Sequence, residues 1–140
     1  MDLKFYKCPR CGNVVIKVVD SGAGLTCCGT NMVELKAGTT DAATEKHVPV
    51  YTVEGNTVSV QVGSVAHPML EEHLINFIAI VTSDGYQVKN LKAGDEPKAT
   101  FTLNEGEEVE AVYEYCNLHG LWKALKVSNL TFFNPLNLIL

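Results

Sequence analysis

The sequence predicts a mainly β protein, in which a small cysteine-rich unit is followed by an antiparallel β-sandwich of immunoglobulin-like type. Three observations lead to this prediction. Apolar and polar side chains alternate along several short segments, turn residues separate these segments, and four of the five cysteines lie within the first 28 residues. Seven short strands at such spacing are typical of a sandwich. The Cys…Trp…Cys spacing of antibody domains is missing, so the prediction concerns architecture only.

Residues 1–37 form the predicted first unit. Residues 14–16 and 18–19 are β-branched and are predicted strands, and residues 20–24 are a predicted turn. Because so short a unit buries little apolar surface, it needs a metal or another cross-link to fold. A run of small and polar residues, 37–44, then leads into the second unit.

The second predicted unit spans residues 38–125 and contains the seven strands of the sandwich. Residues 74–81 are nearly all apolar, which is typical of a central strand buried on both faces. The final segment, 126–140, is a tail with many apolar residues and no predicted role. The predicted strands cover residues 48–53, 57–62, 74–81, 86–88, 99–103, 109–115 and 121–123.

Composition narrows the function further. The 140-residue chain has a formal net charge of −5, which argues against a nucleic-acid partner or an anionic membrane. Neither a signal peptide nor an apolar run long enough to span a bilayer is visible, so we expect a cytoplasmic protein. In that reducing compartment clustered cysteines indicate metal ligands before disulfides.

Cys8, Cys11, Cys27 and Cys28 are the candidate ligands of a first metal. Four thiolates around one tetrahedral ion fit zinc or a single iron, and the spacing leaves a structural zinc and a redox iron both open. A disulfide framework fits the expected compartment less well. Neighbouring cysteines cannot form a Cys-x-x-Cys loop, so we expect Cys27 and Cys28 to distort one angle at the metal.

The remaining cysteine and all four histidines are candidate ligands of a second metal: His47, His67, His73, Cys116 and His119. Each lies at a predicted strand end or in a loop, and such positions can converge at one edge of a sandwich. A surface or buried histidine without a metal is the alternative at any single position. Five ligands are too many for tetrahedral zinc but suit a square-pyramidal iron with its sixth position open.

Blue copper is the main chemical alternative, because it also uses histidines and a cysteine on a β-sandwich. Its weak axial methionine follows shortly after the Cys-x-x-His pair. Here no methionine follows His119, and copper would leave two histidines unused.

At these residues the chain resembles the desulfoferrodoxin family, the two-iron form of superoxide reductase. The resemblance covers residues 1–125 and departs from the family at Leu118, where many relatives have isoleucine, and in the tail. The matching segments, in order, are 5–13, Cys27-Cys28-Gly29, Glu45-Lys46-His47-Val48-Pro49, His67-Pro68-Met69, His73 and Cys116-Asn117-Leu118-His119-Gly120-Leu121-Trp122-Lys123.

The resemblance implies a desulforedoxin-like, rubredoxin-type iron domain joined to an immunoglobulin-like domain in a homodimer. It implies two irons per chain, the second with four equatorial histidines and an axial Cys116. Glu45 would cap the sixth position after oxidation, and Lys46 would attract superoxide. The implied activity is that of an oxidoreductase that detoxifies superoxide under oxidative stress, reducing it to hydrogen peroxide with electrons from rubredoxin or a similar donor.

Formal charges suggest how the two centres differ. Iron with four thiolates carries −1 when ferric and −2 when ferrous and repels superoxide, whereas ferrous iron with four neutral imidazoles and one thiolate carries +1. Two other functions remain possible from the sequence: a dismutase, and an electron carrier or metal-stapled binding module without superoxide chemistry. Glu45 and Lys46 could also be an ordinary exposed ion pair.

Overall fold

The computed structural model describes residues 3–38, 47–63 and 67–125, and strands dominate these segments. In the small unit, β1 (Phe5–Lys7) is paired with β2 (Val14–Ile16) and β5 (Val33–Glu34) in a three-stranded antiparallel sheet. A short hairpin of β3 (Thr26–Cys27) and β4 (Thr30–Asn31) lies beside it. No helix within the described segments is long and apolar enough to cross a membrane.

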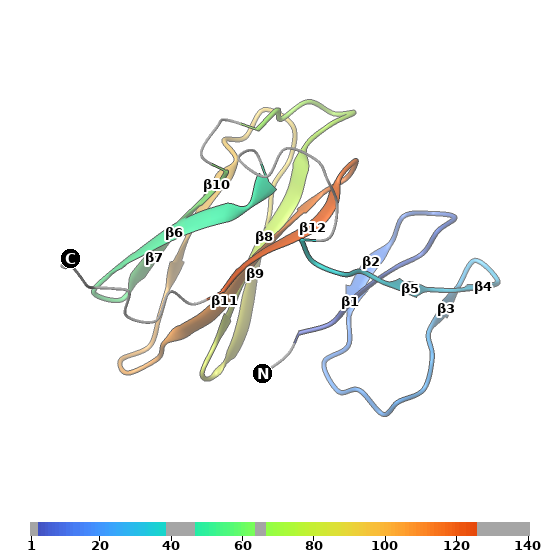
Figure 1. Ribbon diagram of the computed structural model, residues 1–140, viewed down its shortest axis with the longest axis horizontal. Coiled ribbons are helices and arrows are strands. Elements are labelled where there is room, and N and C mark those ends of the chain that lie inside the picture. Colours follow the sequence, from blue (N-terminus) through green and yellow to red (C-terminus); the bar gives the residue numbers. More distant parts are fainter. Residues whose placement is uncertain (1–2, 39–46, 64–66, 126–140) are drawn as a thin grey trace.

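The larger unit is the predicted β-sandwich (Figure 1). One sheet has the order β10-β7-β6 and the other has the order β12-β11-β8-β9, and every pairing is antiparallel. All seven strands predicted in this part of the sequence are present, with ends that differ by up to two residues. Their bounds are β6 (Pro49–Glu54), β7 (Thr57–Val62), β8 (Ile75–Thr82), β9 (Gly85–Asn90), β10 (Lys98–Thr102), β11 (Val109–Cys116) and β12 (Gly120–Leu125).

The main core lies between the two sheets. Along β7 every second residue faces inward, so that Val58, Val60 and Val62 are buried while their neighbours are exposed. They pack with residues of the facing sheet that include Ile78 and Val112. Alternation with a period of two therefore predicted both the strand and the side that it buries.

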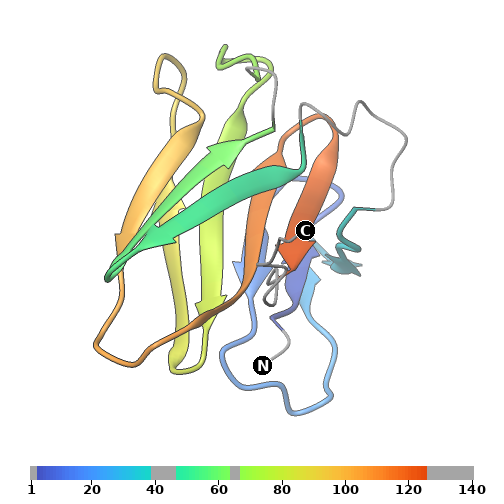
Figure 2. The ribbon, with the colours of Figure 1, turned by 60° about the vertical axis from the view of Figure 1, so that its left-hand side comes forward.

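A second apolar cluster lies on the opposite face of the four-stranded sheet, where the small unit covers it (Figure 2). The Phe5 ring lies 5.6 Å from the ring of Phe77 and 5.1 Å from that of Tyr113. The facing sheet covers one side of β8 and the small unit covers the other. The strand is therefore buried on both faces, as its near-continuous apolar sequence predicted.

The strand predicted at residues 18–19 is wrong. Val18 and Val19 form a bend and are 79% and 84% exposed. β-branched residues favour strands only where a neighbouring strand is available for pairing, and β1 already pairs with β2 and β5. The strands of two or three residues elsewhere in this unit are too short to show a period. The boundaries 1–37, 38–125 and 126–140 stay predictions, and the tail lies outside the described residues.

Candidate metal centres

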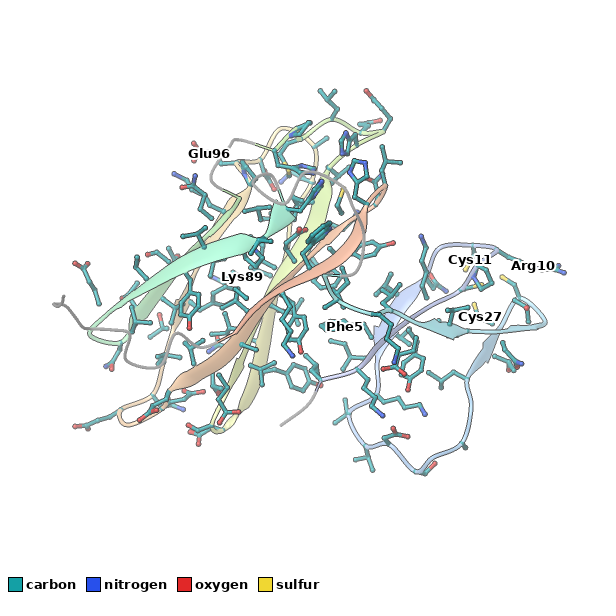
Figure 3. The ribbon with its side chains drawn as sticks, viewed as in Figure 1. Phe5, Arg10, Cys11, Cys27, Lys89 and Glu96 are labelled. Carbon is teal, nitrogen blue, oxygen red and sulfur yellow. The ribbon has the colours of Figure 1, made fainter. Side chains whose placement is uncertain are left out.

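The four sulfurs of the small unit form one compact cluster. The ligand atoms of Cys8, Cys11, Cys27 and Cys28 lie within 4.8 Å of one another. The Sγ atoms of Cys11 and Cys27 are 3.6 Å apart, and those of Cys27 and Cys28 are 3.9 Å apart. Metal–sulfur bonds of about 2.3 Å in a tetrahedron place sulfurs about 3.8 Å apart. The cluster therefore has the size of a four-thiolate site, and Figure 3 shows Cys11 and Cys27 together in the small unit, away from the larger sheets.

Local backbone geometry holds this cluster. The N–H groups of Arg10 and Cys11 each donate to the Cys8 sulfur at 3.4 Å, and the Cys11 N–H lowers the pKa of Cys8 to about 6. Cys28 has φ 56°, a left-handed conformation that is uncommon outside glycine, which lets its sulfur reach the cluster beside Cys27. The nearby Cys11 thiol raises the pKa of Cys28 to about 12. Four sulfurs so close cannot all be ionised unless a cation neutralises them, so the cluster fits a metal.

The four histidines form a closed ring at one end of the sandwich. Ring centroids are 4.8 Å apart for His47 and His67, 4.8 Å for His67 and His73, 5.1 Å for His73 and His119, and 4.7 Å for His119 and His47. An imidazole that binds a metal through nitrogen at about 2.1 Å has its centre about 3.2 Å away, so neighbours at right angles lie about 4.6 Å apart. The spacing of neighbouring rings therefore fits four imidazoles around one ion.

Cys116 supplies the fifth ligand atom. Its sulfur is fully buried and lies 3.8 Å from Nδ1 of His119. The ligand atoms of Cys116, His47, His67 and His119 all lie within 4.8 Å of one another, and His73 joins them through its ring contacts. Burial raises the pKa of the Cys116 thiol. A nearby cation is therefore needed to keep this sulfur ionised at neutral pH.

Two histidines show how their nitrogens are arranged for a metal. Nδ1 of His67 donates to the Pro68 carbonyl at 2.7 Å, which leaves the Nε2 lone pair for a ligand bond. Nε2 of His73 is buried and accepts or donates no hydrogen bond within the described segments. A buried imidazole nitrogen with no such partner is costly unless it binds something, so the residues fit a metal ion.

The positions of these ligands follow from the sandwich. His47 precedes β6, His67 and His73 lie between β7 and β8, Cys116 ends β11, and His119 lies in the turn to β12. Four of these ligands lie at a strand end or in a loop, as predicted, whereas His47 lies in helical backbone two residues before β6.

Asn117 ties two of these segments together. Its Oδ1 accepts the Leu74 N–H at 3.0 Å, and its Nδ2 donates to the Glu72 carbonyl at 3.1 Å. Both partners flank His73, so the turn that carries His119 fixes the segment that carries His73.

Two residues at this site were missed by the sequence analysis. Glu114 is fully buried in β11, and burial raises its pKa to about 9. Trp122 is 1% exposed in β12 and stacks on His47. The alternation of β11 could have indicated that Glu114 is buried, because it lies between Val112 and Cys116 on the inward face of this strand. Glu45 and Lys46, by contrast, lie outside the described residues.

Comparison with known proteins agrees with both centres. The family pattern described as desulfoferrodoxin matches residues 39–125, and that of the desulfoferrodoxin N-terminal domain matches residues 2–35. A desulfoferrodoxin homolog of Archaeoglobus fulgidus is 50% identical over 123 residues, which are 87% of this chain and 96% of the relative. The chain belongs to the desulfoferrodoxin family. The tail lies beyond both matched ranges.

Solved structures show the same fold. The superoxide reductase of Treponema pallidum is 38% identical, with a TM-score of 0.76 over 89% of this chain and 99% of that one. The superoxide reductase of Giardia intestinalis described as 1Fe-SOR covers 59% of this chain and 97% of its own, at 33% identity and a TM-score of 0.51. For a desulfoferrodoxin with these two ligand clusters, the cofactors are two iron ions per chain rather than zinc or blue copper.

Proposed function

We propose that this chain is a superoxide reductase that uses the ring of four imidazoles and Cys116 as its catalytic centre. The reaction takes one superoxide anion, one electron and two protons and yields one hydrogen peroxide. The closed ring carries this proposal, because its four neighbouring imidazoles are similarly spaced and nearly perpendicular, and with Cys116 they would supply five ligands and leave a sixth position for a small molecule. When bound there, ferrous iron supplies the electron.

The ligand set gives the site the right charge. Four neutral imidazoles and one thiolate leave a ferrous centre at +1, which attracts an anion, whereas four thiolates leave the other centre negative. This local difference outweighs the acidic whole, whose formal net charge is −5. The proposal therefore assigns superoxide to the second centre and one-electron relay to the first.

Cys116 is held beside the ring of histidines by its own backbone turn. The backbone N–H groups of Leu118 and His119 interact with this sulfur and lower the pKa that burial raises. N–H groups directed at a thiolate stabilise its charge and restrict its movement. We assign Cys116 the role of an electron-donating ligand that pushes charge toward the open face.

Lys46 and Glu45 are proposed to act at the open face, next in sequence to His47. A lysine there steers superoxide, because two unit charges about 4 Å apart interact by about 4 kcal/mol at an effective dielectric of about 20, before screening by salt. Glu45 is proposed to cap the open position after oxidation. Both roles derive from the family resemblance.

The donor and the setting are also part of the proposal. A rubredoxin or a similar small one-electron protein would reduce the centre after each turnover, and two chains would form a homodimer. The five free cysteines suit a reducing compartment such as the cytoplasm, where thiolates remain available to metals.

The deciding experiment combines metal analysis with a donor requirement. Protein produced with ample iron should contain two irons per chain and should consume superoxide only while a reductant is supplied. Sustained consumption without a reductant would show a dismutase. A single zinc per chain and no superoxide reaction would show a metal-stapled binding module.

A further inference from the structure

Glu114 places an acidic side chain in the core of the sandwich. It is fully buried, and neither of its carboxyl oxygens has a hydrogen-bond partner within the described segments. Its cross-strand neighbours are Ile78 on β8 and Trp122 on β12. A buried carboxyl group without hydrogen bonds is expensive, so a position like this indicates a role that an apolar residue could not fill.

One polar atom close to this carboxyl belongs to a proposed iron ligand. Oε2 of Glu114 lies 3.8 Å from Nδ1 of His47, which is itself 2% exposed. If Nδ1 faces Glu114, the other nitrogen of this imidazole, Nε2, is the one available to the metal. Ligating histidines commonly present their second N–H to a carboxyl group, which fixes the tautomer and the orientation of the ring.

Trp122 supports the same imidazole from its flat side. The two ring centroids are 5.1 Å apart at an interplanar angle of 14°, a stacked arrangement. The indole Nε1 also donates to the His119 carbonyl at 3.2 Å. Trp122 therefore contacts one iron ligand through its ring and the backbone of another through its N–H group.

We infer that Glu114 and Trp122, paired across β11 and β12, are positioning residues that hold His47 with Nε2 toward the second iron. His47 needs such support because it precedes β6 and is not itself in a strand. The carboxyl oxygen sets the tautomer and the indole sets the ring plane. Since either form of the carboxyl offers an acceptor oxygen to Nδ1–H, this role does not depend on its protonation.

The inference rests on the proposed role of His47 as a ligand. Its test therefore measures how fast the protein loses iron rather than how fast it consumes superoxide. Loss of a residue that orients a metal ligand typically weakens metal binding by about 10–100-fold. Glu114→Leu removes the acceptor at similar volume, and Glu114→Gln keeps an acceptor oxygen. Phe101→Leu is a matched control, because Phe101 is equally buried in the core but belongs to β10.

Iron-loaded protein would be mixed with a chelator, and the loss of the thiolate-to-iron absorption band of the second centre would be followed. We expect Glu114→Leu to lose this iron about 10–100-fold faster than the parent chain, and Glu114→Gln and Phe101→Leu to stay within about threefold. Equal rates of iron loss for Glu114→Leu and Glu114→Gln would overturn the inference. So would a rate for Phe101→Leu as fast as that of Glu114→Leu.

Substitutions of Trp122 provide a second test, which does not depend on whether Glu114→Leu folds. Trp122→Phe keeps a ring over His47 and should retain the iron, whereas Trp122→Leu should release it about tenfold faster. Wild-type retention in Trp122→Leu would contradict the role of the indole. His47→Ala separates the two proposals: if it too keeps the iron, His47 is not a ligand, and if it alone loses the iron, only the positioning role fails.

Discussion

At the scale of single residues, one buried sulfur distinguishes the second centre from an ordinary histidine site. Cys116 is fully buried and lies beside His119, where its sulfur would be a ligand of the iron. We predict that Cys116→Ser removes the thiolate-to-iron absorption band and slows superoxide reduction by at least tenfold, because a serine oxygen donates less charge. Optical spectra of iron-loaded protein check this. A band that persists unchanged would show that the sulfur is not a ligand.

Lys46 is predicted to affect the rate of encounter rather than the chemistry. Removing its charge in Lys46→Ala should slow the reaction with superoxide several-fold and should weaken the dependence of that rate on ionic strength. Pulse-generated superoxide at several salt concentrations provides the measurement. If both the rate and its salt dependence match those of the parent chain, the lysine is only a solvated charge.

The residues of both clusters could be selected from the sequence because cysteine and histidine have few roles in a reducing compartment. Cys28 and His73 were candidates because of their residue type and their position beside other candidates or a predicted strand. Glu114 and Trp122 were not, because their role depends on a cross-strand register that places them beside His47. A single chain without a structure shows that a residue faces inward, but not which loop residue it meets there.

At the scale of the elements, one carboxylate links two segments at the end of the sandwich opposite the four histidines. Glu107, in the loop before β11, accepts hydrogen bonds from Oγ1 of Thr82 at the end of β8 and from the Asn104 N–H. The Thr82 hydroxyl, which bonds to the ionised form, holds the pKa of Glu107 below its usual value. The ionised carboxylate therefore stabilises this loop more than the protonated form does.

The pH dependence follows from the sign of that shift. A lowered pKa in the folded state stabilises the protein above the unfolded value of about 4.5, and the stabilisation is lost as pH falls through the folded pKa. We predict that Glu107→Gln is less stable than the parent chain at pH 7 and that the difference shrinks below about pH 4.5. Denaturant titrations across this range measure it. A difference that stays constant with pH would contradict the prediction.

The contact between β1 and the four-stranded sheet should contribute much of the stability. Phe5, which Figure 3 labels between the small unit and the larger sheets, is fully buried. Its ring contacts those of Phe77 and Tyr113. We predict that Phe5→Ala lowers the free energy of unfolding by about 3–5 kcal/mol, because it leaves a cavity in this cluster. Val18→Ala, at an exposed position, should change it by less than about 0.5 kcal/mol. Unfolding at fixed iron content tests both, and equal effects would show that the small unit is not docked.

The strands of the sandwich were predictable because each is long enough to show its period and is bounded by turn residues. In the small unit β2 was predicted at residues 14–16 from its β-branched residues, but the other strands were not, since two or three residues show no period. The apolar run at 74–81 predicted that both faces of β8 are buried. It did not predict that β1 of the small unit covers the second face.

At the scale of the whole molecule, the two centres are built independently. All candidate ligands of the second centre lie between His47 and His119, whereas the small unit contacts the sandwich through apolar residues such as Leu3 and Phe5 and through Lys7, which lies over the Tyr115 ring. The similarity to a Giardia intestinalis superoxide reductase that covers 59% of the chain is consistent with this division. The first centre can therefore be altered without removing any ligand of the second.

We predict that Cys11→Ser leaves the reaction of superoxide with reduced protein within about threefold of the parent rate. Cys11 is an exposed ligand of the small unit, and its loss should change the metal content of the first centre while the packing of Phe5 persists. Rapid mixing of pre-reduced protein with superoxide measures the second centre alone, and far-UV circular dichroism checks the fold. Because pre-reduction removes any need for relay, a folded Cys11→Ser protein that no longer reacts quickly would show that the two centres act as one unit.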